Sequence, residues 1–134
     1  MFRITKSIDF CYGHRLRNYE GKCRFLHGHN GRVEIELQGE TLDERGMLID
    51  FGEIKSVMKK WIDENLDHRM LLQRDDPAVA FIRGQGEPCY LLDENPTAEN
   101  IAKLIYEETR RKGFPVARVV LWETPDSFAA FGEN

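Results

Sequence analysis

Residues 23–38 read Cys-Arg-Phe-Leu-His-Gly-His-Asn-Gly-Arg-Val-Glu-Ile-Glu-Leu-Gln, and they join a regular strand pattern to a cluster of reactive side chains. The second half alternates apolar with polar residues, the apolar ones being Val33, Ile35 and Leu37. Successive side chains of a strand point to opposite faces. The pattern therefore predicts a strand over residues 32–38 with one buried face and one solvated face.

The first half of the stretch predicts a metal site. His27 and His29 are two residues apart, so in extended chain both imidazoles point the same way and can share one ion, with Gly28 adding no bulk between them. Zinc is the default ion for imidazole ligands, and three histidines with an open fourth position are typical of a catalytic site. His14 is the best candidate for the third ligand. The alternative for an isolated His-x-His is a pair of surface histidines.

Length and composition indicate one globular domain over residues 1–134. The net charge of −4 argues against general nucleic-acid binding. No apolar run approaches the length of a membrane span, and the N-terminus lacks a signal-peptide pattern, so we expect a cytoplasmic protein with no membrane partner. The three cysteines are then expected to be free thiols rather than a disulfide framework.

The wider pattern predicts an α+β fold. Apolar spacing indicates four strands and two helices in the order ββααββ, with strands at 2–10, 32–38, 116–123 and 127–131 and helices at 50–66 and 97–112. Separate runs of strands and helices favour a four-stranded antiparallel sheet with both helices on one face. Residues 73–95 are expected to be irregular. Met47, Met58 and Trp61 are expected in the core.

The segment between His14 and the His-Gly-His motif is rich in cations. It contains four cations against one acid, namely Arg15, Arg17, Lys22 and Arg24 against Glu20. This excess next to the expected metal site is able to hold an anionic substrate, and the alternative is a solvated charged loop.

Polar groups gather in three further places: Leu66-Asp67-His68, the segment 95–100 that opens the second helix, and Trp122-Glu123-Thr124. Together with Tyr-Gly-His14-Arg-Leu, Cys23-x3-His27-Gly-His29 and the segment 46–51, these motifs cover nearly the whole chain. In this order they resemble the 6-pyruvoyl-tetrahydropterin synthase and 6-carboxy-tetrahydropterin synthase family.

The resemblance implies a tunnelling fold, in which subunits pool their sheets into a barrel, typically as a homohexamer built from two trimers. It also implies a role for each site residue. His14, His27 and His29 would hold Zn2+, Cys23 would be the general base, Asp67 and His68 would transfer protons, and Glu123 with Thr97 would bind the pterin substrate.

The simpler structural roles are a buried, inert thiol for Cys23, a helix C-terminal cap for Asp67 and His68, a helix N-cap for Thr97, and a surface acid for Glu123.

The resemblance further implies a lyase acting on 7,8-dihydroneopterin triphosphate. The three-residue gap between Cys23 and His27 is typical of the 6-carboxy branch of queuosine biosynthesis, which releases acetaldehyde and triphosphate. The pyruvoyl-forming branch, which eliminates triphosphate without carbon–carbon cleavage, usually has a longer gap and is the nearest alternative. A zinc hydrolase with Glu123 as its base and a non-catalytic zinc-binding module are alternatives of other classes.

The chain departs from the family pattern in three places. Cys11-Tyr12-Gly13 stands where small residues often precede the zinc histidine, so Cys11 is a rival thiol or ligand. Asn30-Gly31 lacks the aromatic residue that commonly follows His-Gly-His. The segment 73–95 is longer than in compact members of the family.

Overall fold

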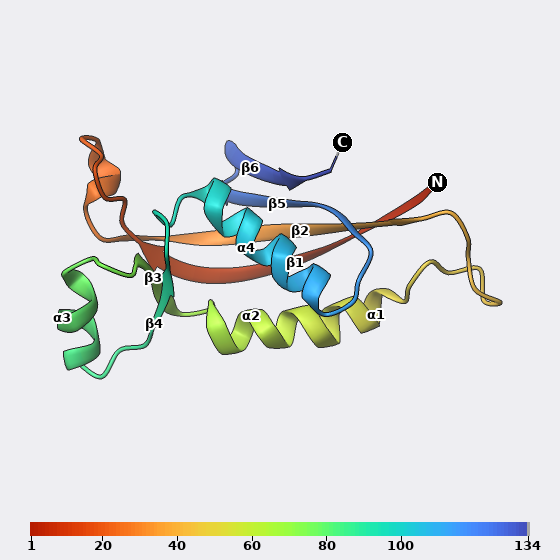
Figure 1. Ribbon diagram of the computed structural model, residues 1–134, viewed down its shortest axis with the longest axis horizontal. Helices are drawn as coiled ribbons and strands as arrows, with labels where there is room; N and C mark the ends of the chain where they lie inside the picture. The colour runs from red at the N-terminus through yellow and green to blue at the C-terminus, as the bar shows by residue number, and fades with distance from the viewer. Residues whose placement is uncertain (134) are drawn as a thin grey trace.

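A six-stranded sheet forms the centre of the protein in the computed structural model, which describes residues 1–133. The two longest strands, β1 (Phe2–His14) and β2 (His27–Gly39), pair antiparallel along their whole length. In Figure 1 they run side by side through the middle of the molecule. Both the strand at 2–10 and the strand at 32–38 are confirmed, and each extends to include the histidines expected to bind metal.

The remaining strands flank this central pair. β5 (Val116–Thr124) and β6 (Ser127–Gly132) form an antiparallel hairpin beside β2, as predicted. Two strands that we did not predict, β3 (Arg69–Gln73) and β4 (Cys89–Leu92), add to the other edge, and β3 pairs parallel with both β1 and β4. The prediction of a four-stranded, wholly antiparallel sheet is therefore wrong: the sheet is mixed, in the order β4-β3-β1-β2-β5-β6.

The two predicted helices form, and their caps are those that the sequence indicates. The first comprises α1 (Phe51–Ile54), a π-helical stretch (Lys55–Lys59) and α2 (Lys60–Asn65), and Asp50 caps it by accepting a hydrogen bond from Gly52 N. The second, α4 (Ala98–Arg111), is capped by Thr97, whose side chain accepts from Asn100 N. The segment 73–95 is not irregular, because it contains α3 (Ala78–Gly84) and β4.

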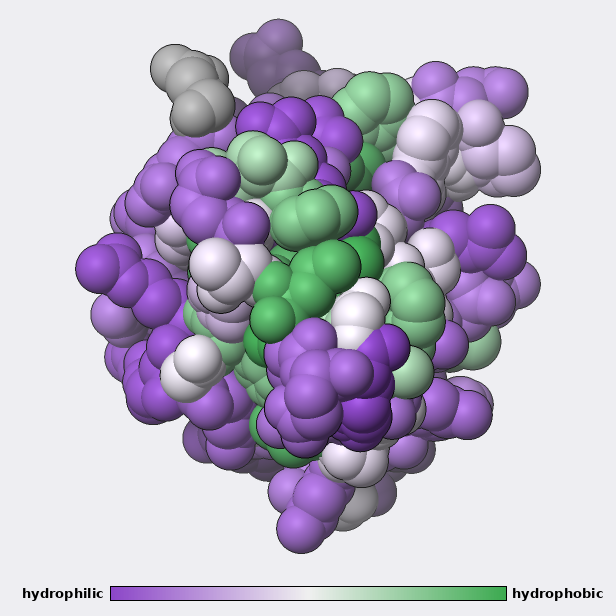
Figure 2. Space-filling view, turned by 90° about the vertical axis from the view of Figure 1, so that its right-hand side faces the viewer, coloured by the Kyte–Doolittle hydropathy of each residue, from purple (hydrophilic) through white to green (hydrophobic). Residues whose placement is uncertain are grey.

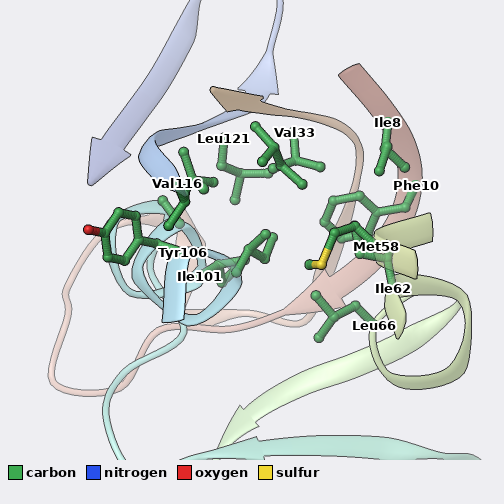
Figure 3. Close-up of a cluster of buried hydrophobic side chains, with 14 of the residues drawn as sticks. Ile8, Phe10, Val33, Met58, Ile62, Leu66, Ile101, Tyr106, Val116 and Leu121 are labelled. Carbon is green, nitrogen blue, oxygen red and sulfur yellow. The ribbon is translucent and has the colours of Figure 1, made fainter. Parts of the chain in front are cut away.

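One apolar core lies between the sheet and its two long helices. Met58 and Ile62 from the first helix and Ile101 from α4 are fully buried against Val33 and Leu121 of the sheet. Figure 3 shows these side chains converging from both helices and from β1, β2 and β5. Because both helices share this core, the prediction that they cover one sheet face is confirmed.

Hydrophobic side chains also gather on the surface at one end of the molecule. Figure 2 shows them on the end where Figure 1 places the N-terminus, the start of α1 and the segment that precedes it. Phe2, Met47 and Phe51 are 47%, 40% and 51% exposed, so the prediction that Met47 is a core residue is wrong. Met58 is buried as expected, and Trp61 packs against the core while partly exposed.

Within residues 1–133, no helix is long and apolar enough to cross a membrane.

Candidate active site

Strand pairing brings the three predicted metal ligands together. His14 at the end of β1 lies directly opposite His27 at the start of β2, and Tyr12 lies opposite His29. His27 and His29 are an even number of residues from Val33 along β2, so their side chains point to the same, helix-covered face of the sheet. The imidazole centroids are 4.5 Å apart for His14 and His27, 5.1 Å for His14 and His29, and 5.0 Å for His27 and His29.

Backbone carbonyls fix the orientation of two of the rings. His14 Nδ1 donates to Pro96 O at 2.7 Å, and His27 Nδ1 donates to Phe25 O at 2.7 Å. A neutral imidazole whose Nδ1 carries the proton presents a bare lone pair at Nε2. The Nε2 atoms of His14, His27 and His29 are all buried, and none has a hydrogen-bond partner.

Burial keeps two of these histidines in the form that binds metal. The pKa of His14 is lowered to about 4, chiefly by burial; the hydrogen bond to Pro96 opposes the shift, and the neighbouring imidazoles add to it. Burial also lowers the pKa of His29, against the opposing charge of Glu123. Both rings are therefore neutral at pH 7, which is the state required of an imidazole ligand.

The cluster fits a divalent metal ion. The three ligand nitrogens lie within 4.8 Å of one another, and they are the one such group of three or more His, Cys, Asp or Glu side chains in residues 1–133. Three imidazoles, with carbonyls orienting two of them through Nδ1, are the ligand set and outer support of many metal sites. Unpartnered, buried nitrogens are costly, and a metal ion would satisfy all three at once.

Glu123 lies beside this cluster at the end of β5. Its Oε2 is 2.9 Å from His29 Nε2 and 3.8 Å from His14 Nε2, although neither contact has hydrogen-bond geometry. The carboxylate is about one quarter exposed. It is thus able both to face a bound molecule and to compete for the metal.

Asp67 and His68 form a pair at the start of β3, with His68 Nδ1 2.8 Å from Asp67 Oδ2. Asp67 also accepts from Cys11 N at 2.9 Å, and His68 N donates to Cys11 O at 2.6 Å. Burial acts to raise the pKa of Asp67, but the hydrogen bonds from Cys11 and His68 outweigh it and leave that pKa below its ordinary value. The carboxylate is therefore ionised and able to orient the imidazole.

This pair adjoins residues that face the other side of the sheet from the histidine cluster. Asp67 lines a cavity of about 670 Å³, and His68 lines one of about 590 Å³. The second cavity lies at the edge of the cluster, because His27 and His29 also contribute to its lining. Cys11 and Asn30 line both cavities, and their side chains alternate along the strands with those of Tyr12 and His29. The side chains of Cys11 and Asn30, which flank the Asp67–His68 pair, therefore leave the sheet on the face opposite to the metal ligands.

Neither cysteine near the site is a metal ligand in this geometry. Cys11 Sγ lies 2.9 Å from Asn30 Oδ1 on the dyad's side of the sheet, so the alternative of Cys11 as a ligand is wrong. Cys23 lies in a short helix (Lys22–Arg24) between β1 and β2, partly buried, and it is outside the group of metal-ligating atoms. That position agrees with a thiol that stays off the metal.

Two cations of the 15–24 segment lie close to carboxylates of the protein. Arg15 makes a bidentate ion pair with buried Asp76, with Nε 2.8 Å from Oδ2. This pair lowers the pKa of Asp76 through the hydrogen bonds from Arg15, against the opposing effect of burial. Arg17 lies 3.8 Å from Asp75. The ion pair gives Arg15 a structural role, and the binding of an anionic substrate by this segment stays a prediction.

Thr97 supports the site indirectly, through the residue that precedes it. As the N-cap it fixes the start of α4, and the preceding Pro96 supplies the carbonyl that orients His14. The sequence Asn-Pro-Thr before a helix indicates a helix cap, but it does not indicate that Pro96 contacts His14, 82 positions away.

Tyr12 is a residue of the site that we did not predict. It is 3% exposed, its ring packs edge-on against His14 with centroids 5.3 Å apart, and its hydroxyl is buried with no hydrogen-bond partner. Burial raises its pKa far above the ordinary value, and the charge of Glu123 adds to the effect. Tyr12 therefore stays protonated and is a hydrogen-bond donor.

Comparison with known proteins identifies the family of this chain. The sequence pattern of the 6-pyruvoyl tetrahydropterin synthase family matches residues 3–134. The chain belongs to this family. Family relatives named 6-carboxy-5,6,7,8-tetrahydropterin synthase include one from Rickettsia felis, 42% identical over 96% of this chain and 98% of its own, and one from Haemophilus influenzae, 30% identical over 99% and 100%.

Solved structures confirm the fold of this family member. An uncharacterized protein from Wolinella succinogenes superposes with a TM-score of 0.79 at 30% identity, over 99% of this chain and 98% of that one. The 6-pyruvoyl tetrahydropterin synthase of Caenorhabditis elegans gives a TM-score of 0.74 at 24% identity, over 99% and 96%. The expectation of an α+β tunnelling fold is thus confirmed, with six strands instead of four.

Proposed function

We propose that the chain is a zinc-dependent 6-carboxy-5,6,7,8-tetrahydropterin synthase. It would convert 7,8-dihydroneopterin triphosphate and water to 6-carboxytetrahydropterin, acetaldehyde and triphosphate, as a step of queuosine biosynthesis. The observation that carries the proposal is the convergence of three buried, unpartnered Nε2 atoms beside Glu123. The names of the relatives and the three-residue gap between Cys23 and His27 support the choice of product.

His14, His27 and His29 would hold the metal, and Glu123 with Thr97 would hold the pterin. Zn2+ bound to three imidazoles supplies Lewis acidity, which lowers the pKa of a substrate hydroxyl. The Glu123 carboxylate is able to accept two hydrogen bonds from the amino and ring N–H groups of a pterin.

Cys23 and the Asp67–His68 pair would move the protons. The thiolate is the reactive form of a cysteine, and in that form Cys23 would be able to take a proton from the carbon next to the bound hydroxyl. Asp67 orients His68 through this contact, so the imidazole would be able to relay a proton.

The separation of the dyad from the metal ligands supports an oligomer. Because the side chains that flank the dyad leave the sheet on the face opposite to the metal ligands, we propose that Asp67 and His68 of one copy act at the metal site of a second copy. The exposed apolar end that includes Phe2 and Phe51, and the open edges at β4 and β6, would be covered in a hexamer of two trimers. The three free thiols fit a reducing cytoplasm.

Product analysis tests the proposal. The zinc-loaded protein incubated with 7,8-dihydroneopterin triphosphate should release acetaldehyde together with triphosphate. A pyruvoyl product without acetaldehyde would instead establish the pyruvoyl-forming branch, and absence of any pterin binding would indicate a non-catalytic zinc module.

Cys23→Ala should retain stoichiometric zinc and lose turnover by about 10²- to 10⁴-fold, which is the usual contribution of a general base. Cys89→Ala is the matched control, because Cys89 is a free, partly buried thiol on β4 away from the histidines. A Cys23→Ala protein that still turns over at the native rate would favour the hydrolase alternative, and one that loses its zinc would make Cys23 a ligand.

A further inference from the structure

The Tyr12 hydroxyl is a buried donor without a partner. The residue is 3% exposed, and its oxygen makes no hydrogen bond within residues 1–133. A buried tyrosine hydroxyl ordinarily finds a partner, because burying the group unpaired is unfavourable. The hydroxyl is therefore poised for a partner that arrives when the site is occupied.

Tyr12 stands on β1 beside the metal ligands, and its ring lies over Gly31 of β2, on the way to β5, the strand that carries Glu123. It is paired opposite His29, with ring centroids 5.6 Å apart, and its ring crosses over Gly31. A Cβ at Gly31 would lie 2.9 Å from Tyr12 Cε1, so glycine is what makes room for the ring. Since Arg32 pairs with Trp122, the next residues outward, Gly31 and Glu123, are neighbours across the strands.

Glu123 occupies a position that metal binding would change. Its Oε2 lies 2.9 Å from His29 Nε2 and 3.8 Å from His14 Nε2, the atoms whose lone pairs a metal ion would take. With these nitrogens taken by a metal ion, the carboxylate would be free either to bind the ion itself or to accept a hydrogen bond from a neighbouring donor. Among the buried side-chain donors of residues 1–133 that lack a partner, the Tyr12 hydroxyl is the one that belongs to a ring packed on the histidines.

We propose that, in the metal-loaded protein, the Tyr12 hydroxyl donates a hydrogen bond to Glu123 and holds that carboxylate off the metal. A coordination position then stays open for an oxygen of the substrate, and the remaining lone pairs of Glu123 stay available to the pterin. Tyr12 is a positioning residue that acts through Glu123. The inference rests on the metal site of the proposed function.

Cobalt substitution gives a test that does not depend on turnover. Zn2+ is spectroscopically silent, whereas Co2+ in the same ligands has visible absorption that reports its ligand set. Azide would serve as a probe of the open position, with its dissociation constant read from the cobalt spectrum. Tyr12→Phe removes the hydroxyl and keeps the ring. It should change the cobalt spectrum and weaken azide binding on the order of tenfold, the usual effect of losing a hydrogen bond to a charged group.

Two further variants decide the mechanism. Tyr106→Phe is the matched control, because Tyr106 is 6% exposed on α4 and its hydroxyl contacts Glu133 rather than the site; its azide affinity should equal that of the native protein. In a Glu123→Gln background, Tyr12→Phe should change azide affinity by less than about twofold, because the competing carboxylate is gone.

Unchanged azide affinity and spectrum in Tyr12→Phe would overturn the inference, as would a full tenfold effect that persists with Glu123→Gln. Either result leaves the metal site itself standing. A chain that binds no Co2+ at all would remove both the inference and the proposed function.

Discussion

Metal binding should stabilise the fold strongly, because the metal-free state buries three unpartnered imidazole nitrogens. Each such atom costs about 1–3 kcal/mol. An ion that binds only the folded chain adds about 4 kcal/mol to the free energy of unfolding when its free concentration is 1,000 times Kd. For a chain of 134 residues this corresponds to a rise in Tm of about 10–20 °C.

The assay is thermal unfolding of the metal-free protein, with and without a small excess of Zn2+. His29→Ala removes one of the three ligands and should reduce the zinc-dependent rise to below about a third. His68→Ala is the matched control, since its side chain is 78% exposed and lies outside the cluster, and the full rise should remain. Equal rises in the native protein and His29→Ala, or loss of the rise in His68→Ala, would refute the assignment of the ligands.

Two predictions concern the support of the site. Asp76 has a pKa lowered by its hydrogen bonds to Arg15, so its contribution to stability is present above its unfolded pKa and is lost as pH falls through the lower folded value. Asp76→Asn should cost about 1.5–3 kcal/mol at pH 7, the range for hydrogen bonds to charged groups, and should flatten the loss of stability below pH 4 in urea titrations. An unchanged loss of stability at acid pH would contradict this prediction. Gly31→Ala should lower the free energy of unfolding by about 1–3 kcal/mol, because the new Cβ meets the Tyr12 ring. Adding Tyr12→Ala to the same chain should relieve part of that cost. If the two substitutions lower the free energy of unfolding in urea by strictly additive amounts, the contact is not the cause.

The elements with long, regular patterns were predictable, and the short ones were not. Val33, Ile35 and Leu37 are all fully buried, as their alternation predicts. β3 and β4 have only five and four residues, and apolar runs of that length do not distinguish strand from helix. Their parallel pairing also joins segments far apart in the chain, so no local signal indicates it.

The candidate site, like the fold, was predictable only where the signal is local. The spacing of His27 and His29 indicates a shared ligand face, and the structure bears out that geometry. The contacts that support the cluster are different, because they join residues 82 positions apart for His14 and Pro96 and 61 positions apart for Arg15 and Asp76. Such pairs depend on how α3 and α4 dock against the sheet, and no spacing within one segment encodes them.

The metal ligands and the core residues of β2 occupy alternate positions of one strand, so the site and the core constrain each other's evolution. The side chains of His27 and His29 lie on the same face of β2 as those of Val33 and Leu37. Inserting or deleting one residue at positions 30–32 would move the side chains on one side of the change to the opposite face of the sheet. Either the histidines would turn to solvent, or the apolar row would. Length changes in this strand are therefore tolerable only in twos or with a compensating bulge, whereas a change of one residue in the loop at 15–26 does not reverse the faces of either strand. In descendants of this gene, insertions and deletions of single residues should therefore be found in the 15–26 loop more often than in β2.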